Sequence, residues 1–255
     1  MRSVLRYGIV AAVVAVVVAA SAVGVASAAS PAPVPGGPAG SGMCAAQASA
    51  ARSGGTVAAL RTFADCEITR RMTTLGQLSA AVGASKSLTS ADAAALSTDI
   101  ASASSGLASL KAKIDNGTSI VALKLQIVEI VTRFRVYLLL GPQVRLTIAA
   151  DDVLALKPHF DGISTSLAGR IAQAIANGKD VASAQASLAA MNAAVASAEA
   201  LASPLPAQLL ALTPAQYNAG MGGPVLQKAR GALIEARDDL KAAAQDGRDV
   251  LADLE

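Results

Sequence analysis

The sequence predicts an all-α protein, an elongated antiparallel helical bundle with coiled-coil-like packing. Alanine, the best helix former, makes up roughly a quarter of the chain. Apolar residues recur at spacings of three and four, which is typical of one face of a helix. Beyond the N-terminal region, no segment shows the alternation of apolar and polar residues that marks a half-buried strand.

The N-terminal region predicts export. Arg2 and Arg6 precede an uncharged apolar run from Gly8 to Val25, and Ala26-Ser27-Ala28 has the small-x-small pattern that signal peptidase recognises. We therefore expect residues 1–28 to be a signal peptide. An uncleaved N-terminal membrane anchor is the alternative, since about 18 apolar residues is the lower limit for spanning a bilayer. Both interpretations place the remainder outside the cell membrane, secreted or associated with the cell envelope.

The rest of the chain divides into a linker and a helical region. Residues 29–42 are rich in Pro and Gly, which favours a flexible linker. Residues 43–255 are expected to form one helical bundle domain. Two sub-bundles that share a helix at 118–157 are the alternative.

Charge gives no support for nucleic-acid binding. The whole chain has 21 basic and 18 acidic side chains. Removal of residues 1–28 takes away two arginines and no acidic residue, which leaves 19 against 18 and a net charge of about +1. A nearly neutral protein lacks the positive surface that phosphate backbones require.

The two cysteines predict a disulfide. Cys44 and Cys66 each lie eleven positions from Gly55. If the segments on both sides are helical, the Gly54-Gly55 turn brings both cysteines to about 15 Å from it, at ~1.5 Å per residue. In an exported protein this spacing favours a disulfide-clamped αα-hairpin. Two free thiols are the alternative.

Helices are expected in six segments, and most are joined by short turns that favour antiparallel neighbours. The expected ranges are 56–83, 89–115, 118–157, 160–176, 180–202 and 224–254.

The second of these helices has the clearest boundaries. Thr89 and Asp92 resemble a capping box at its start, and Gly117 favours a left-handed cap at its end. Its apolar seam follows four-three spacing and comprises Leu96, Ile100, Ala103, Leu107, Leu110 and Ile114.

The later helices show similar seams. Asp180 is the expected N-cap of helix 180–202. In helix 224–254, leucines recur at sevens and are interrupted at Gly247, beside a parallel row of small residues, a pattern that lets helices approach closely. The two rows are Leu226, Leu233, Leu240 and Leu254, and Ala229, Ala236, Ala243 and Val250.

Residues 203–223 are expected to connect these helices. Pro204, Pro206, Pro214 and the glycine-rich run 220–223 rule out one continuous helix. Thr213 followed by Pro214 is a typical start of a short helix, with an N-cap and Pro at the first helical position.

The central helix, 118–157, contains most of the unusual residues. Pro142 lacks a backbone donor and crowds the carbonyl of Leu138, which predicts a kink at Pro142 with the helix continuing beyond it; a reversal is the alternative. Arg135, Tyr137 and Arg145 surround the expected bend and are the candidate contact site for a partner. The seam leading to the bend is Ile120, Leu123, Ile127, Ile130, Phe134, Tyr137 and Gly141.

The sequence gives no case for an enzyme or a cofactor. The single histidine, His159, lies near Asp151, Asp152 and Asp161, but without the spacing of a metal site. Asp161 is instead the expected N-cap of helix 160–176. No nucleophile or phosphate-binding motif occurs. We therefore expect a non-enzymatic protein with no metal.

The expected function is that of a scaffold, spacer or partner-binding module at the cell envelope. Its partner would be an unknown protein or envelope component, and peripheral membrane association is compatible with the sequence. The alternative is a binder of an apolar ligand or lipid through an Ala-rich helical core. The absence of Trp weakens this alternative.

Two stretches resemble a known group of proteins. The first is FRVY at 134–137 with PQVR at 142–145 and AAD at 149–151, and the second is TPAQYN at 213–218. Both resemble uncharacterised, exported, Ala-rich helical proteins of high-GC Gram-positive bacteria, and the similarity covers about residues 60–254. The resemblance implies an exported all-α protein and brings no activity or site residues with it.

Overall fold

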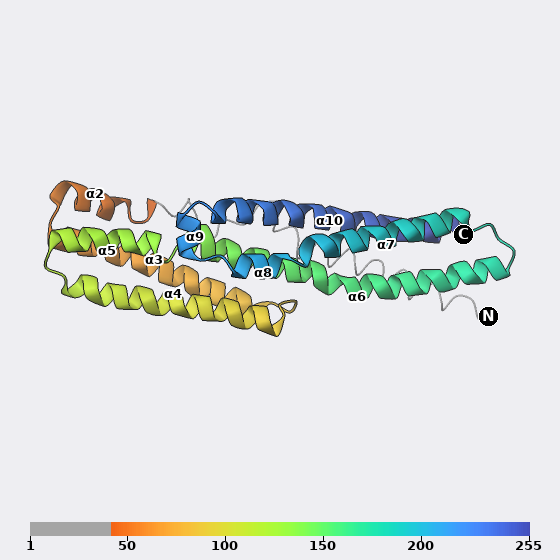
Figure 1. Cartoon of the computed structure of the whole chain (residues 1–255), viewed down its shortest axis with the longest axis horizontal. Coiled ribbons are helices and arrows are strands. Elements are labelled where there is room, and N and C mark those ends of the chain that lie inside the picture. The colour runs from red at the N-terminus through yellow and green to blue at the C-terminus, as the bar shows by residue number, and fades with distance from the viewer. Residues whose placement is uncertain (1–41) are drawn as a thin grey trace. The chain divides into compact units, whose positions relative to one another are not determined.

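A computed structural model of the chain describes residues 42–255 (Figure 1). The predicted signal peptide, 1–28, and all but the last residue of the predicted linker lie outside the described residues. Within 42–255 every regular element is a helix and no strand occurs, so the all-α prediction is confirmed. The elements are α2 (Ala45–Gly54), α3 (Val57–Ala84), α4 (Ser90–Asn116), α5 (Ile120–Thr132), a π turn (Val136–Leu140), α6 (Gly141–Ala176), α7 (Ala182–Ala202), α8 (Leu205–Leu210), α9 (Pro214–Asn218) and α10 (Gly222–Asp253).

The described residues fall into two compact units. One comprises residues 42–151 and Pro204–Gly231 and is called the disulfide unit below. The other comprises Asp152–Ser203 and Ala232–Glu255 and is called the C-terminal unit. The boundaries fall inside the two long helices α6 and α10, so each unit contains part of both helices.

The N-terminal hairpin of the disulfide unit forms as its cysteine spacing predicts. Cys44 and Cys66 are joined by a disulfide, with their Cα atoms 5.9 Å apart. The turn between α2 and α3 uses Gly55 in a left-handed conformation (φ 56°), which glycine adopts without steric cost. The disulfide holds α2, whose Ala51 is buried, against α3.

Helices α3, α4 and α5 alternate in direction and share one core (Figure 1). Threonine or serine caps each N-terminus, and its side chain accepts a backbone N–H from three residues further on. The core contains the whole predicted seam of α4 together with Leu60, Ala64, Ile68, Leu75, Leu78 and Val82 of α3.

Both ends of α4 are completed by other helices. The Thr89 hydroxyl accepts the Asp92 N–H, as expected, but the Thr89 N–H is taken by Asp151 Oδ2 at 3.0 Å. The predicted left-handed cap at Gly117 is wrong, since its φ is −73°. Arg61 of α3 donates to the carbonyls of Ile114 and Gly117, at 3.2 and 2.6 Å, and so satisfies helix-end acceptors without that cap.

The predicted kink at Pro142 is wrong, because the helix breaks earlier. α5 ends at Thr132, and Arg135 adopts a left-handed conformation with φ 44° and ψ 35°. The π turn follows, in which the N–H of Leu140 bonds to the Arg135 carbonyl and that of Gly141 to the Val136 carbonyl. Pro142 lies in the first turn of α6, where a missing donor is tolerated.

Two predicted helices, 118–157 and 160–176, also have the wrong boundary at Pro158. α6 runs through Pro158 to Ala176. Residues on both sides, Leu156 and Phe160, pack into the core of the C-terminal unit, and this packing maintains the helix despite the lost hydrogen bond. Asp161 is therefore a helix-interior residue, paired with Lys157 at 2.8 Å, and not an N-cap.

The C-terminal unit packs parts of α6 and α10 against α7. α7 begins at Ala182, with Val181 at the N-cap position, although the predicted cap Asp180 does accept the Ala182 N–H at 3.1 Å. Gly247 lies where a Cβ would be 3.2 Å from Met191 Sδ, so α10 approaches α7 closely there. The core is Phe160, Leu167, Ile171, Ala174, Val181, Ala184, Met191, Val195, Ala243 and Val250.

Residues 203–223 contain two short helices. α9 starts as predicted, with Pro214 at its first turn and a full capping box between Thr213 and Gln216. α8 was not predicted; its apolar side chains Leu205 and Leu209 are buried. Both belong to the disulfide unit.

Candidate partner-binding surface

Arg135 joins the helix break to α9. Its Nε donates to Asn218 Oδ1 at 2.6 Å, and its guanidinium lies 5.3 Å from the ring centre of Tyr217. Asn218 Nδ2 in turn donates to the Thr132 carbonyl at 2.8 Å, near the end of α5. The left-handed conformation of Arg135 is therefore held by contacts with a segment more than eighty residues away in sequence.

A second polar link joins the start of α6 to α8. The buried Gln143 side chain donates to the carbonyls of Leu209 and Leu212, at 2.7 and 2.9 Å. Together with the Arg135–Asn218 bond, this contact holds residues 135–143 beside residues 209–218. Both contacts therefore fix the residues that flank the break to segments distant in sequence.

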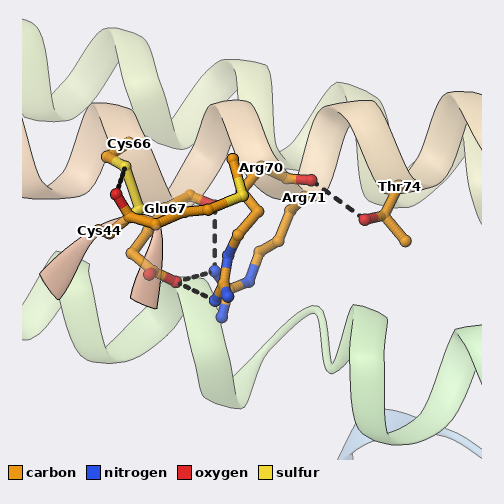
Figure 2. A network of polar contacts seen from close by, with 7 residues as sticks. Cys44, Cys66, Glu67, Arg70, Arg71 and Thr74 are labelled. Atoms are coloured by element: carbon orange, nitrogen blue, oxygen red, sulfur yellow. Dashed lines mark hydrogen bonds and ion pairs between the residues drawn. A yellow bond between two sulfur atoms is a disulfide. The ribbon is translucent and has the colours of Figure 1, made fainter. Parts of the chain in front are cut away.

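Tyr137 lies against a pair of arginines on α3. The guanidinium groups of Arg70 and Arg71 are 4.8 and 5.1 Å from its ring centre. Figure 2 shows both arginines facing Glu67, close to the Cys44–Cys66 disulfide. Two cations share one carboxylate here, and the electron-rich face of Tyr137 offsets part of the excess positive charge. Arg71 is only 5% exposed, so this cluster connects the π turn to α3 within the unit.

The three predicted contact residues therefore do not form one site. Arg135 contacts α9 and Tyr137 contacts α3. Arg145 lies on the exposed side of α6, and partial desolvation lowers the pKa of its guanidinium. Of the three, Arg145 alone is exposed.

An apolar surface that the sequence analysis missed lies on α5. Val121, Leu125 and Val128 are 70%, 68% and 57% exposed. Their spacing of four and three places them on one side of the helix. On the opposite side Leu123 and Ile130 are 0% and 1% exposed and pack into the core. We call the stripe formed by Val121, Leu125 and Val128 the α5 face.

The borders of the α5 face carry two charges of opposite sign. Lys124 lies along one border and Glu129 along the other, by the helical repeat of 3.6 residues. Glu129 also pairs with Arg133 at 2.5 Å, one turn further on. Val131 and Ile120, 42% and 40% exposed, extend the apolar surface on the Lys124 side.

The sequence contained a signal for this surface. The packing confirms the predicted seam on α5 for Leu123, Ile127 and Ile130. It is wrong for Ile120, which is 40% exposed. The same thirteen residues contain a second stripe with four-three spacing, which a search for one seam passes over. When a short helix has two apolar stripes and packs against only one core, the second stripe stays exposed to solvent.

The acidic residues near His159 have structural partners. Asp151 accepts the Thr89 N–H, and Asp161 pairs with Lys157. Among residues 42–255, no three His, Cys, Asp or Glu side chains gather as a metal site requires.

One described segment, Ala182–Leu210, is long and apolar enough to cross a membrane by length and composition. Core helices of folded proteins share this length and composition, and Ala184, Met191 and Ala202 of this segment are buried. No protein-family model, curated protein or solved structure matches the chain. The fold and surface define an all-α, disulfide-containing protein with an exposed aliphatic helix face.

Proposed function

We propose that this is an exported, non-enzymatic helical protein that acts as a scaffold or partner-binding module at the cell envelope, with the α5 face as its binding surface. The observation that carries this proposal is the exposure of three large aliphatic side chains on one stripe, backed by a packed core. Contiguous exposed apolar surface of this kind marks interaction sites in folded proteins.

The energetics favour a covered α5 face. Full burial of one Val or Leu side chain contributes about 1.5–3 kcal/mol. All three residues keep more than half of their accessible surface in the free chain, so a partner that covers them gains much of that amount at each position. The rigid backing by Leu123 and Ile130 means that little conformational entropy is lost when a partner binds.

Several features support the structural part of the proposal. The disulfide is compatible with an extracellular location. An elongated antiparallel bundle with coiled-coil-like packing is supported by the four-three seam of α4 and by the close approach of Gly247 to Met191. Two acidic side chains near His159 have structural contacts: Asp151 accepts the Thr89 N–H, and Asp161 pairs with Lys157.

Site-specific photo-cross-linking in intact producing cells tests the proposal. A photoreactive amino acid at position 128 is expected to give one defined product, which Leu125→Asp abolishes because a charge on the stripe opposes burial. The same photoreactive amino acid at position 228, exposed on α10, serves as the control. Equal yields at 128 and 228, or a product that survives Leu125→Asp, would argue against a partner on the α5 face.

A further inference from the structure

We infer that the occupant of the α5 face is the same face of a second copy, with the two α5 helices parallel in a short coiled coil. This inference rests on the proposed function, in which the α5 face binds a partner. It goes further by naming the partner and the direction of pairing.

The first argument is the register of α5. Val121, Leu125 and Val128 occupy the d, a and d positions of a heptad repeat, and Thr132 the next a position. In this register Leu123 and Ile130 are both f positions, the side opposite the seam. Both are buried in the core of their own unit, which turns the a and d positions outward to face a partner helix.

The second argument is charge complementarity at the borders. Lys124 occupies a g position and Glu129 the following e position. In a parallel pair, a g residue lies next to the e residue five positions on in the other helix. Each Lys124 therefore meets Glu129 of the second copy, and two-fold symmetry makes this contact twice.

The same two charges disfavour the competing occupants. In an antiparallel pair, g residues lie beside g residues and e beside e, so that lysine would oppose lysine and glutamate would oppose glutamate. A lipid surface favours helices with a basic border and with Trp or Phe on the apolar side. The α5 face has one charge of each sign at its borders and only aliphatic residues on the stripe.

Charge reversal tests the pairing in the purified exported protein with its disulfide intact. Analytical ultracentrifugation is expected to show a concentration-dependent dimer. Lys124→Glu or Glu129→Lys alone turns two attractive contacts into repulsive ones, which should raise the dimer dissociation constant by about tenfold. The double variant restores both contacts with the signs exchanged, and its dissociation constant should return to within about threefold of the original.

Two controls keep this result specific. Lys228→Glu makes the same charge change on the exposed part of α10 and should leave the dimer unchanged. Glu129→Lys also removes the ion pair with Arg133, but the double variant lacks that pair too, so its recovery cannot come from there. Circular dichroism of each variant shows whether its helices remain formed.

A cysteine cross-link tests the direction. In the parallel pair, position 125 faces position 125 of the other copy, so Leu125→Cys should form a disulfide-linked dimer under mild oxidation. Ile234→Cys, at an exposed aliphatic position of α10, should remain unlinked under the same conditions. An antiparallel pair would instead bring position 125 opposite position 128.

The outcomes separate this inference from the proposed function. A protein that stays monomeric at all concentrations, but cross-links through position 128 to another macromolecule in cells, overturns the second-copy inference and leaves the proposed function in place. A monomer with no such product overturns both. A dimer that ignores the charge reversals and forms no 125–125 link uses another surface, and the inference is wrong.

Discussion

The two units of the chain differ in the kinds of side chain that they bury. The core of the C-terminal unit consists of apolar side chains on regular helices. The disulfide unit contains all the polar side chains that are buried among residues 42–255: Arg71, Thr74, Gln143, Thr147 and Asp151. Three of them, Arg71, Gln143 and Asp151, contact elements distant in sequence.

Exposed aliphatic side chains are divided in the same unequal way. Among the described residues, the C-terminal unit exposes Ile175 and Ile234, whereas the disulfide unit exposes the α5 face. The contrast teaches that the regular helices of the C-terminal unit bury most of their large apolar side chains in their own core. The unit whose central helix is broken retains a second apolar stripe for a partner.

The largest expected effect is the loss of the disulfide. Replacing Cys44 and Cys66 together by serine should lower the free energy of unfolding by about 3 kcal/mol, because the bond closes a loop with a sequence separation of 22. Hydrogen exchange should show the loss first in α2 and the adjoining part of α3. Unchanged protection in α2 would mean that packing of Ala51 alone holds that helix.

The next effect concerns a buried polar link of the disulfide unit. Gln143→Met keeps the shape of the side chain but removes its donors to the Leu209 and Leu212 carbonyls. We expect a loss of about 2 kcal/mol, the usual cost of leaving buried acceptors unsatisfied. Gln77→Met, on the exposed side of α3, is the matched control and should change stability little. Denaturant unfolding measures both, and equal effects would remove the distinction between the units.

Glycine substitutions compare the units directly. A Cβ on Gly106 would overlap the Phe134 ring, 2.9 Å from its Cζ, whereas one on Gly247 would lie 3.2 Å from the flexible Met191 sulfur. Gly106→Ala should lose about 1–2 kcal/mol, and Gly247→Ala should be nearly neutral. Gly76→Ala, with open space around it, should gain up to ~1 kcal/mol from helix propensity. A stabilising Gly106→Ala would show that Phe134 can move aside.

The regular elements could be predicted from the sequence because their causes are local. The seam of α4, the Cys44–Cys66 hairpin and the capping box of α9 each depend on residues close in the chain. The break before Pro142 depends on contacts between residues distant in sequence. The Phe134 ring packs directly against Gly106, and Arg135 contacts α9. No local sequence pattern shows these contacts. The sequence therefore predicts the change in helix direction at Pro142, the nearest residue that breaks helices.

The smallest expected effect is a difference in stability between two variants of Arg135, the residue at the helix break. Arg135→Ala removes the contacts with Asn218 and Tyr217 and keeps a non-glycine residue at φ 44°. Arg135→Gly removes the same contacts but relieves the strain of the left-handed conformation, so it should be more stable than Arg135→Ala by about 1 kcal/mol. Thermal unfolding of the two variants measures this difference. Equal stabilities would indicate that the break straightens once its link to α9 is lost, and the broken helix would then depend on that link alone.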